Sequence, residues 1–237
     1  MRAGITGLVL LALLAGCTTG APVVQEPLPL AATPAQRAAR AQVESFVSVI
    51  DRVEPVAEAI CRQHAAAQEC DLQIVVDNRL DQPPNAFQTI DARGRPVVGF
   101  TLALIADARN ADEIAFVLGH EAAHHIAGHI PKREATARRA EVLAGALARA
   151  NGAAATDVRA AQQIAAELAA RSYSRQFELE ADALGAEIAL RAGFDPLLGA
   201  AFFDRLPDPG DQFLGTHPPN AERRAVVQQT VRRLSGA

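Results

Sequence analysis

Two histidines and a glutamate stand at a spacing that can bind and use a metal ion. The chain runs His120-Glu121-Ala122-Ala123-His124, within a stretch whose pattern predicts a helix. At about 100° per residue, the two histidines lie about 40° apart on the helix surface, so both imidazoles can bind one ion. Glu121 lies about 100° from His120, where it can take a proton from a metal-bound water without binding the metal. This pattern predicts a zinc site with Glu121 as a general base.

A zinc site of this kind needs a third protein ligand, and two carboxylates further along the chain can supply it. Glu178 and Asp182 are four residues apart, so they share one face of a predicted helix. One carboxylate can bind the ion while the other holds a ligand histidine by its free N–H group. Spacing leaves open which carboxylate has which role. A charged helix face paired with Arg175 is the alternative.

Two further histidines follow the pair. The metzincin pattern needs a glycine at position 127 and a histidine at position 130, but Ala127 and Ile130 stand there, so that subclass is excluded. On a continued helix His129 would face away from His120, and His125 is badly aimed as well. We expect both to be surface groups or groups that contact the ligands from outside.

The elements that position these residues are helices and one small sheet. Residues 35–69 have apolar positions at helical spacing, with an interruption expected near Pro55. Strands are predicted at 72–76, 86–90 and 96–101, and the residues between the last two form a hairpin connection. The predicted fold class is therefore α+β and mostly helical.

The helix with the histidine pair has a clear start signal. Asn110 can cap it, and Glu113 three residues later completes a capping box. The helix is expected to end near residues 128–131. The other helices are predicted at about 102–108, 131–150, 157–171, 174–192, 196–205 and 219–234.

Composition is that of a globular protein. The 237 residues are 49% hydrophobic, with a mean hydropathy of +0.06, which excludes a disordered chain. The net charge of −4, from 23 basic and 27 acidic residues, gives no electrostatic footprint for nucleic acid. We expect one domain over residues 35–237.

The first 34 residues have the pattern of a targeting segment. An apolar run over residues 5–15 follows Arg2 and is too short to span a bilayer of about 30 Å. It ends in Leu14-Ala15-Gly16-Cys17, which resembles a bacterial lipobox. This predicts a signal peptide of residues 1–16, an acylated Cys17, and a proline-rich tether over residues 17–34. An ordinary signal peptide that happens to contain a cysteine is the alternative.

The remaining cysteines fit an exported protein. If Cys17 carries lipid, Cys61 and Cys70 are left, and in an oxidising compartment they can form a disulfide. Two free buried thiols are the alternative. Thr18, instead of an aspartate, follows the lipidated position and favours the outer over the inner membrane. We therefore expect a lipid-anchored domain in the cell envelope that faces the periplasm.

Four motifs in order resemble metallopeptidase family forty-eight, whose relatives include HtpX and the CAAX prenyl proteases. The resemblance covers about residues 35–235. The motifs are Asn85-Ala86-Phe87, the stretch from Asn110 to His129, Arg175-x-x-Glu178-x-Glu180-Ala181-Asp182-x-x-Gly185, and Thr216-His217-Pro218-Pro219 with Arg223.

The resemblance implies a zincin-like domain of the gluzincin type, with Glu178 as the third zinc ligand and Asp182 as the carboxylate behind a ligand. It implies that the strand near Val97–Thr101 is a sheet edge to which an extended substrate adds. It also implies that His217 reaches the open zinc position, as a gate or fourth ligand, or as a donor to the oxyanion. A surface histidine at the start of a helix is the alternative for His217.

The sequence as a whole predicts a zinc-dependent metalloendopeptidase that binds one Zn²⁺ and cuts extended or misfolded polypeptides in the cell envelope. The competing hypothesis is a latent-protease chaperone or outer-membrane assembly factor with a structural, closed zinc site. The two differ in whether the zinc keeps an open coordination position. The sequence does not specify an oligomeric state.

Overall fold

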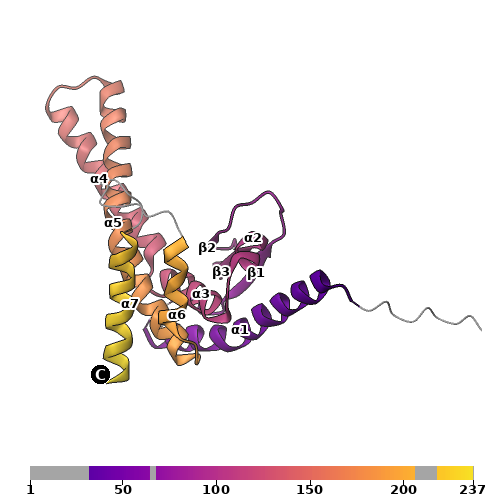
Figure 1. The fold of residues 1–237 in the computed structure, drawn as a ribbon. Coiled ribbons are helices and arrows are strands. Elements are labelled where there is room, and N and C mark those ends of the chain that lie inside the picture. Colours follow the sequence, from indigo (N-terminus) through magenta and orange to yellow (C-terminus); the bar gives the residue numbers. More distant parts are fainter. Residues whose placement is uncertain (1–31, 65–67, 206–217, 237) are drawn as a thin grey trace, which may run out of the picture.

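The computed structural model describes residues 32–64, 68–205 and 218–236. Within these residues the chain folds as a mostly helical α+β domain with one small sheet, as the sequence predicts (Figure 1). The predicted signal peptide, Cys17 and His217 lie outside the described residues. None of the described helices combines the length and the apolar character that crossing a bilayer requires.

Helix α3 (Ala111–Ile126) is the centre of the fold and carries the histidine pair. Its start is capped by Asn110 as predicted, because the Asn110 side chain accepts from the Glu113 N–H. The Glu113 carboxylate accepts from the Arg109 N–H, one residue before the N–H that a capping box uses. The chain turns at Gly128, whose φ of 66° is a left-handed conformation that glycine adopts without strain. Most of the side chains of α3 are buried, so its position is fixed on nearly every side.

Helix α1 (Pro34–His64) packs along α3. Its buried residues follow a helical spacing and include Val49, Val53 and Ala57. The interruption expected near Pro55 is wrong, because the helix continues through the proline. The buried residues on both sides of Pro55 hold the two halves of α1 against the same core.

The sheet has the strand order β1-β3-β2, with β1 at Gln73–Asp77, β2 at Ala86–Ile90 and β3 at Pro96–Thr101. β3 pairs in parallel with β1 and antiparallel with β2. The implied role of Val97–Thr101 as a sheet edge is therefore wrong, because both sides of β3 are already paired. The burial pattern explains this order: β3 is buried along nearly its whole length, whereas β2 is half exposed. β1 and β2 are therefore the two edge strands, and β2 contacts α3.

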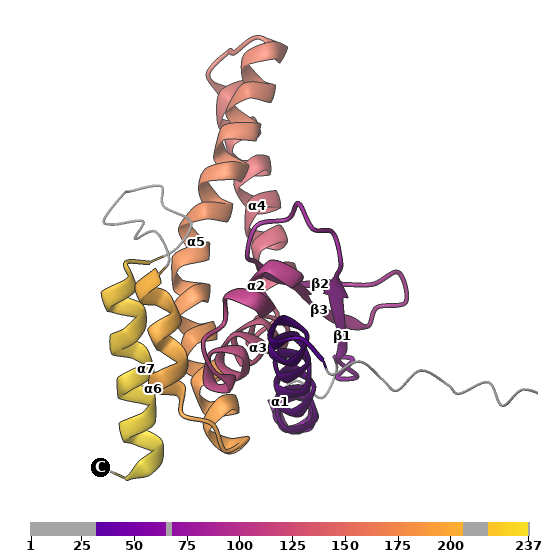
Figure 2. The same ribbon diagram turned by 45° about the vertical axis from the view of Figure 1, so that its right-hand side comes forward.

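Helices α4 (His129–Ala150) and α5 (Ala155–Arg191) form a long antiparallel hairpin that projects from the rest of the domain (Figures 1 and 2). α5 is continuous where the sequence predicts two helices, at 157–171 and 174–192. The stretch between them contains no proline or glycine that would break a helix. The C-terminal half of α5 crosses α3 and brings a second set of polar residues to it.

Short elements complete the domain. α2 (Leu102–Asp107) follows β3, and α6 (Pro196–Ala200), the 3-10 helix η1 (Ala201–Arg205) and α7 (Asn220–Ser235) follow α5. Figure 2 shows α6 and α7 beside the lower part of α5. The contacts of α6 with α3 and of α7 with α5 place both helices around the crossing of α3 and α5.

The predicted disulfide is confirmed. Cys61, in the last turns of α1, is bonded to Cys70, which precedes β1. Both cysteines are buried. Closing a loop this short lowers the entropy of the unfolded chain, which stabilises the fold by about 2–3 kcal/mol. The bond also fixes the start of the sheet against α1.

Candidate metal centre

Three side chains from α3 and α5 converge on one point. The Nε2 atoms of His120 and His124 lie 3.1 Å apart. Glu178 Oε2 lies 3.4 Å from His120 Nε2, and Glu178 Oε1 lies 3.5 Å from His124 Nε2. Zinc with bonds of about 2.0–2.1 Å in a tetrahedral arrangement holds its ligand atoms about 3.3 Å apart. The donor types and their separations therefore fit a metal ion, and within the described residues no other group of three His, Cys, Asp or Glu side chains converges in this way.

The crossing of two helices sets these distances. A Cβ atom on Gly119 would lie 2.7 Å from the backbone oxygen of Gly185. A Cβ atom on Gly185 would lie 2.7 Å from the backbone nitrogen of His120. The absence of side chains at both positions lets α3 and α5 touch backbone to backbone. Glu178 thereby comes within reach of the histidine pair.

Asp182 lies beside the Nδ1 atom of His120, a position from which it could orient the imidazole. Its Oδ1 lies 2.9 Å from His120 Nδ1, and its side chain is fully buried. The Arg223 guanidinium of α7 donates to both carboxylate oxygens of Asp182, at 2.8 and 2.7 Å. It also lies over the ring of Phe203, 3.8 Å from the centroid. Arg223 belongs to the last sequence motif, but the sequence alone assigned it no role.

The electrostatics of the site favour a cation. Burial lowers the pKa of His120, but the carboxylates of Asp182 and Glu178 outweigh burial and raise it above the ordinary value. Burial, together with the charge on His120, lowers the pKa of His124. The carboxylates that raise the pKa of His120 would likewise stabilise a metal cation at its Nε2, and such a cation would displace the proton there.

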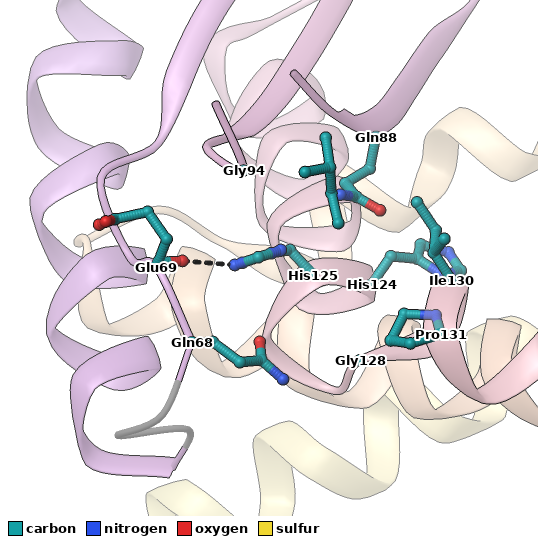
Figure 3. Close-up of a pocket in the computed structure, with 10 residues that line it drawn as sticks. Gln68, Glu69, Gln88, Gly94, His124, His125, Gly128, Ile130 and Pro131 are labelled. Atoms are coloured by element: carbon teal, nitrogen blue, oxygen red, sulfur yellow. Dashed lines mark hydrogen bonds between the residues drawn. The ribbon is translucent and has the colours of Figure 1, made fainter. Parts of the chain in front are cut away.

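The two remaining histidines of this region, His125 and His129, point in different directions. The expected orientation of His129, away from the site, rests on one continuous helix and is wrong because α3 ends before Gly128. The expectation that it contacts a ligand from outside agrees with its position beside His124. His129 begins α4 and its Nδ1 lies 2.9 Å from the Nδ1 of His124. His125 does point away, as expected: Figure 3 shows it directed at Glu69, whose backbone oxygen lies 2.6 Å from His125 Nε2.

Glu121 lines two pockets. One is a polar pocket that it lines with Gln88, His124 and Glu178, among others. The other is a pocket of about 360 Å³ that reaches from His120 and Glu121 into an apolar interior. Its apolar walls are Leu104, Phe116, Val117, Phe202 and Phe203.

Residues of strand β2 line these pockets. Gln88 lines the polar pocket and also the pocket of Figure 3, which includes His124 and Ile130. Asn85 and Ala86 line the apolar pocket. The edge of the sheet and the histidine pair therefore face the same set of pockets, an arrangement that can hold an extended chain across the three converging side chains.

Comparison with known families agrees with this geometry. The family model described as Peptidase family M48 matches residues 48–231. This range contains all three converging residues, Glu121, Asp182 and Arg223. A search of curated proteins finds no match.

Proposed function

Since the chain belongs to peptidase family M48, a family of metal-dependent peptidases, we propose that it is a zinc-dependent metalloendopeptidase of the gluzincin type. The observation that carries the proposal is the convergence of two imidazole nitrogens and one carboxylate at 3.1–3.5 Å, with Glu121 next to them. That set leaves one position of a tetrahedral metal for the reaction.

Each residue has a defined part in peptide hydrolysis. His120, His124 and Glu178 would hold the zinc, which when bound polarises the substrate carbonyl and lowers the pKa of a water molecule. Glu121 takes the proton from the attacking water and passes it to the leaving amine. Asp182 and Arg223 keep the His120 imidazole in the orientation that directs its Nε2 at the metal.

The substrate is an extended polypeptide that pairs with β2. An edge strand has backbone N–H and C=O groups that a further strand can use. Of the two edge strands, β2 has residues that line the pockets on both sides of Glu121. The apolar pocket takes a large aliphatic or aromatic side chain from a residue next to the cleaved bond, because its walls are aliphatic and aromatic.

The cell envelope is the proposed location. The lipobox around Cys17 supports anchoring by lipid, with the domain in the periplasm and the outer membrane favoured. The Cys61–Cys70 disulfide also supports an oxidising compartment. Extended or misfolded polypeptides are the substrates that such a domain meets there.

The test uses the purified full chain. Metal content is measured first, and casein hydrolysis is followed before chelation, after chelation and after zinc is returned. We expect about one zinc per chain and hydrolysis that chelation abolishes and zinc restores. Zinc without any hydrolysis would instead favour the closed, structural site of a chaperone or assembly factor. A chain that binds no metal would refute the proposal.

A further inference from the structure

The Nδ1 atoms of the two ligand histidines contact different kinds of side chain. His120 Nδ1 faces the buried carboxylate of Asp182 directly. His124 Nδ1 faces a third imidazole, that of His129, at 2.9 Å. The other nitrogen of His129, Nε2, lies 3.2 Å from Glu180 Oε2. A line of contacts therefore runs from Glu180 through His129 to His124.

The chemistry of imidazole fixes the direction of this line. A neutral imidazole has one N–H donor and one acceptor nitrogen. For His124 to offer a bare Nε2 to a metal, its proton must be on Nδ1, which then donates to His129 Nδ1. His129 must in turn carry its own proton on Nε2, which donates to the Glu180 carboxylate. Each group thereby selects the tautomer of the next.

The surroundings of His129 hold its ring in place. The ring is 4% exposed and stacks on Phe177 with a centroid distance of 4.2 Å and an interplanar angle of 12°. Phe177 is the neighbour of the ligand Glu178, so the same turn of α5 supplies a metal ligand and the surface that orients His129. The left-handed turn at Gly128 brings His129 back over α3 to meet that surface.

We infer that His129 is a positioning residue for the metal site: it accepts the Nδ1–H of His124, with Glu180 behind it, and so directs His124 Nε2 at the metal. This inference rests on the proposed zinc site. It concerns a residue outside the ligand set, and it assigns a use to Glu180, which the sequence motif contains without a role. The inference requires a hydrogen-bond acceptor at the δ position of residue 129, where it can accept from His124 Nδ1–H.

Two substitutions separate this role from packing. In His129→Asn, the Oδ1 atom can take the place of Nδ1 as the acceptor. In His129→Leu, the apolar volume against Phe177 is kept and the acceptor is lost. If His129 served only to pack, the leucine variant would be the milder change at this buried position. Under our inference the asparagine variant is the milder one for zinc binding.

The measurement is zinc affinity of the full chain, by competition with a chromophoric chelator, together with thermal unfolding of the metal-free protein. We expect His129→Leu to lose zinc affinity about 10–100-fold, as is typical when the partner behind a ligand is removed, and His129→Asn to keep most of it. The matched control is His125→Leu: this histidine is also buried, but it contacts the Glu69 backbone and no ligand. His125→Leu is expected to leave the zinc affinity unchanged.

Equal zinc affinities for wild type and His129→Leu, or a weaker affinity for His129→Asn than for His129→Leu, would overturn the inference and leave the proposed zinc site standing. A wild-type chain that binds no zinc would overturn both. The unfolding temperature of the metal-free variants shows whether a loss of affinity reflects a loss of fold.

Discussion

Gly119 of α3 and Gly185 of α5 lie in direct backbone contact, and their contact decides how close Glu178 comes to the histidine pair. A Cβ atom on Gly185 would meet the His120 backbone nitrogen at 2.7 Å and the His120 Cα at 2.9 Å. Backbone atoms cannot rotate aside as the end of a side chain can. Any side chain at position 185 therefore separates the two helices.

Gly185→Ala should weaken both the fold and the metal site. We expect a loss of about 1–3 kcal/mol in the free energy of unfolding, the usual cost of overpacking, and a lower zinc affinity because Glu178 moves away from His120. Denaturant unfolding and chelator competition measure the two effects. Gly145→Ala is the control, since its Cβ would meet the side chain of Gln162, which can move. Unchanged zinc affinity in Gly185→Ala would contradict the role of the contact.

Glu121→Gln should separate chemistry from metal binding. Glutamine keeps the shape of the side chain but cannot accept the proton of the attacking water, so turnover should fall by about 10²–10⁴-fold. The zinc content should stay at the wild-type level. Glu141→Gln, on the exposed face of α4, is the control and should be fully active. Loss of zinc in Glu121→Gln would mean that Glu121 is a ligand.

Glu178 and Asp182 should differ in their effect on the metal. Glu178→Ala removes a ligand and should abolish tight zinc binding. Asp182→Asn keeps the shape beside His120 Nδ1 and Arg223, so it should cost only about 10–100-fold in zinc affinity. Chelator competition on both variants gives the ranking, and the reverse order would exchange the two roles.

The apolar pocket should set the preference at one residue beside the cleaved bond. Val117→Phe adds volume to the pocket wall, so cleavage of peptides with large apolar residues at that position should fall while cleavage of those with small residues persists. Profiling a peptide library with wild type and variant measures the shift. Val142→Phe, exposed on α4, should leave the profile unchanged, and a uniform loss across all peptides in Val117→Phe would argue against the assignment.

Cys17→Ser should release the protein from membranes. Without the sulfur there is no site for the lipid that the lipobox predicts, so the chain should move from the membrane fraction to the soluble fraction and lose labelling by palmitate. Cys61 and Cys70 are bonded to each other and cannot substitute for it. Palmitate labelling that persists in Cys17→Ser would show that the lipobox interpretation is mistaken.

Local patterns predicted the site well where the chemistry lies within one helix. The spacing of His120, Glu121 and His124 specifies their faces as soon as the helix is recognised, and the capping box at Asn110 marks where that helix begins. Glu178 and Asp182 share a face for the same reason. The resemblance then assigned their roles, and the distances from Glu178 to the histidines and from Asp182 to His120 agree with that assignment.

The errors lie where structure depends on distant parts of the chain or on one turn. Strand pairing is non-local, so nothing within residues 96–101 shows that β3 has a neighbour on each side. His129 was misplaced because helical periodicity was extended beyond α3, whereas the left-handed conformation of Gly128 reverses the direction of the chain. The closeness of Gly119 and Gly185 depends on how two helices cross, which neither glycine reveals alone.

If substrates pair with β2 as proposed, the shortness of this strand has a consequence for which proteins are cleaved. The five residues of β2 can pair only with an equally short segment of substrate. The backbone N–H and C=O groups of a residue inside a native sheet or helix are already hydrogen-bonded. Such a segment becomes accessible only when the client opens locally, and the free energy of that opening differs between regions and between proteins. When opening and closing are fast compared with cleavage, the rate follows the population of the open form. The enzyme would then discriminate between substrates by their conformational stability more than by their sequence, and a destabilising mutation in a substrate protein would raise its rate of degradation without creating a new cleavage site.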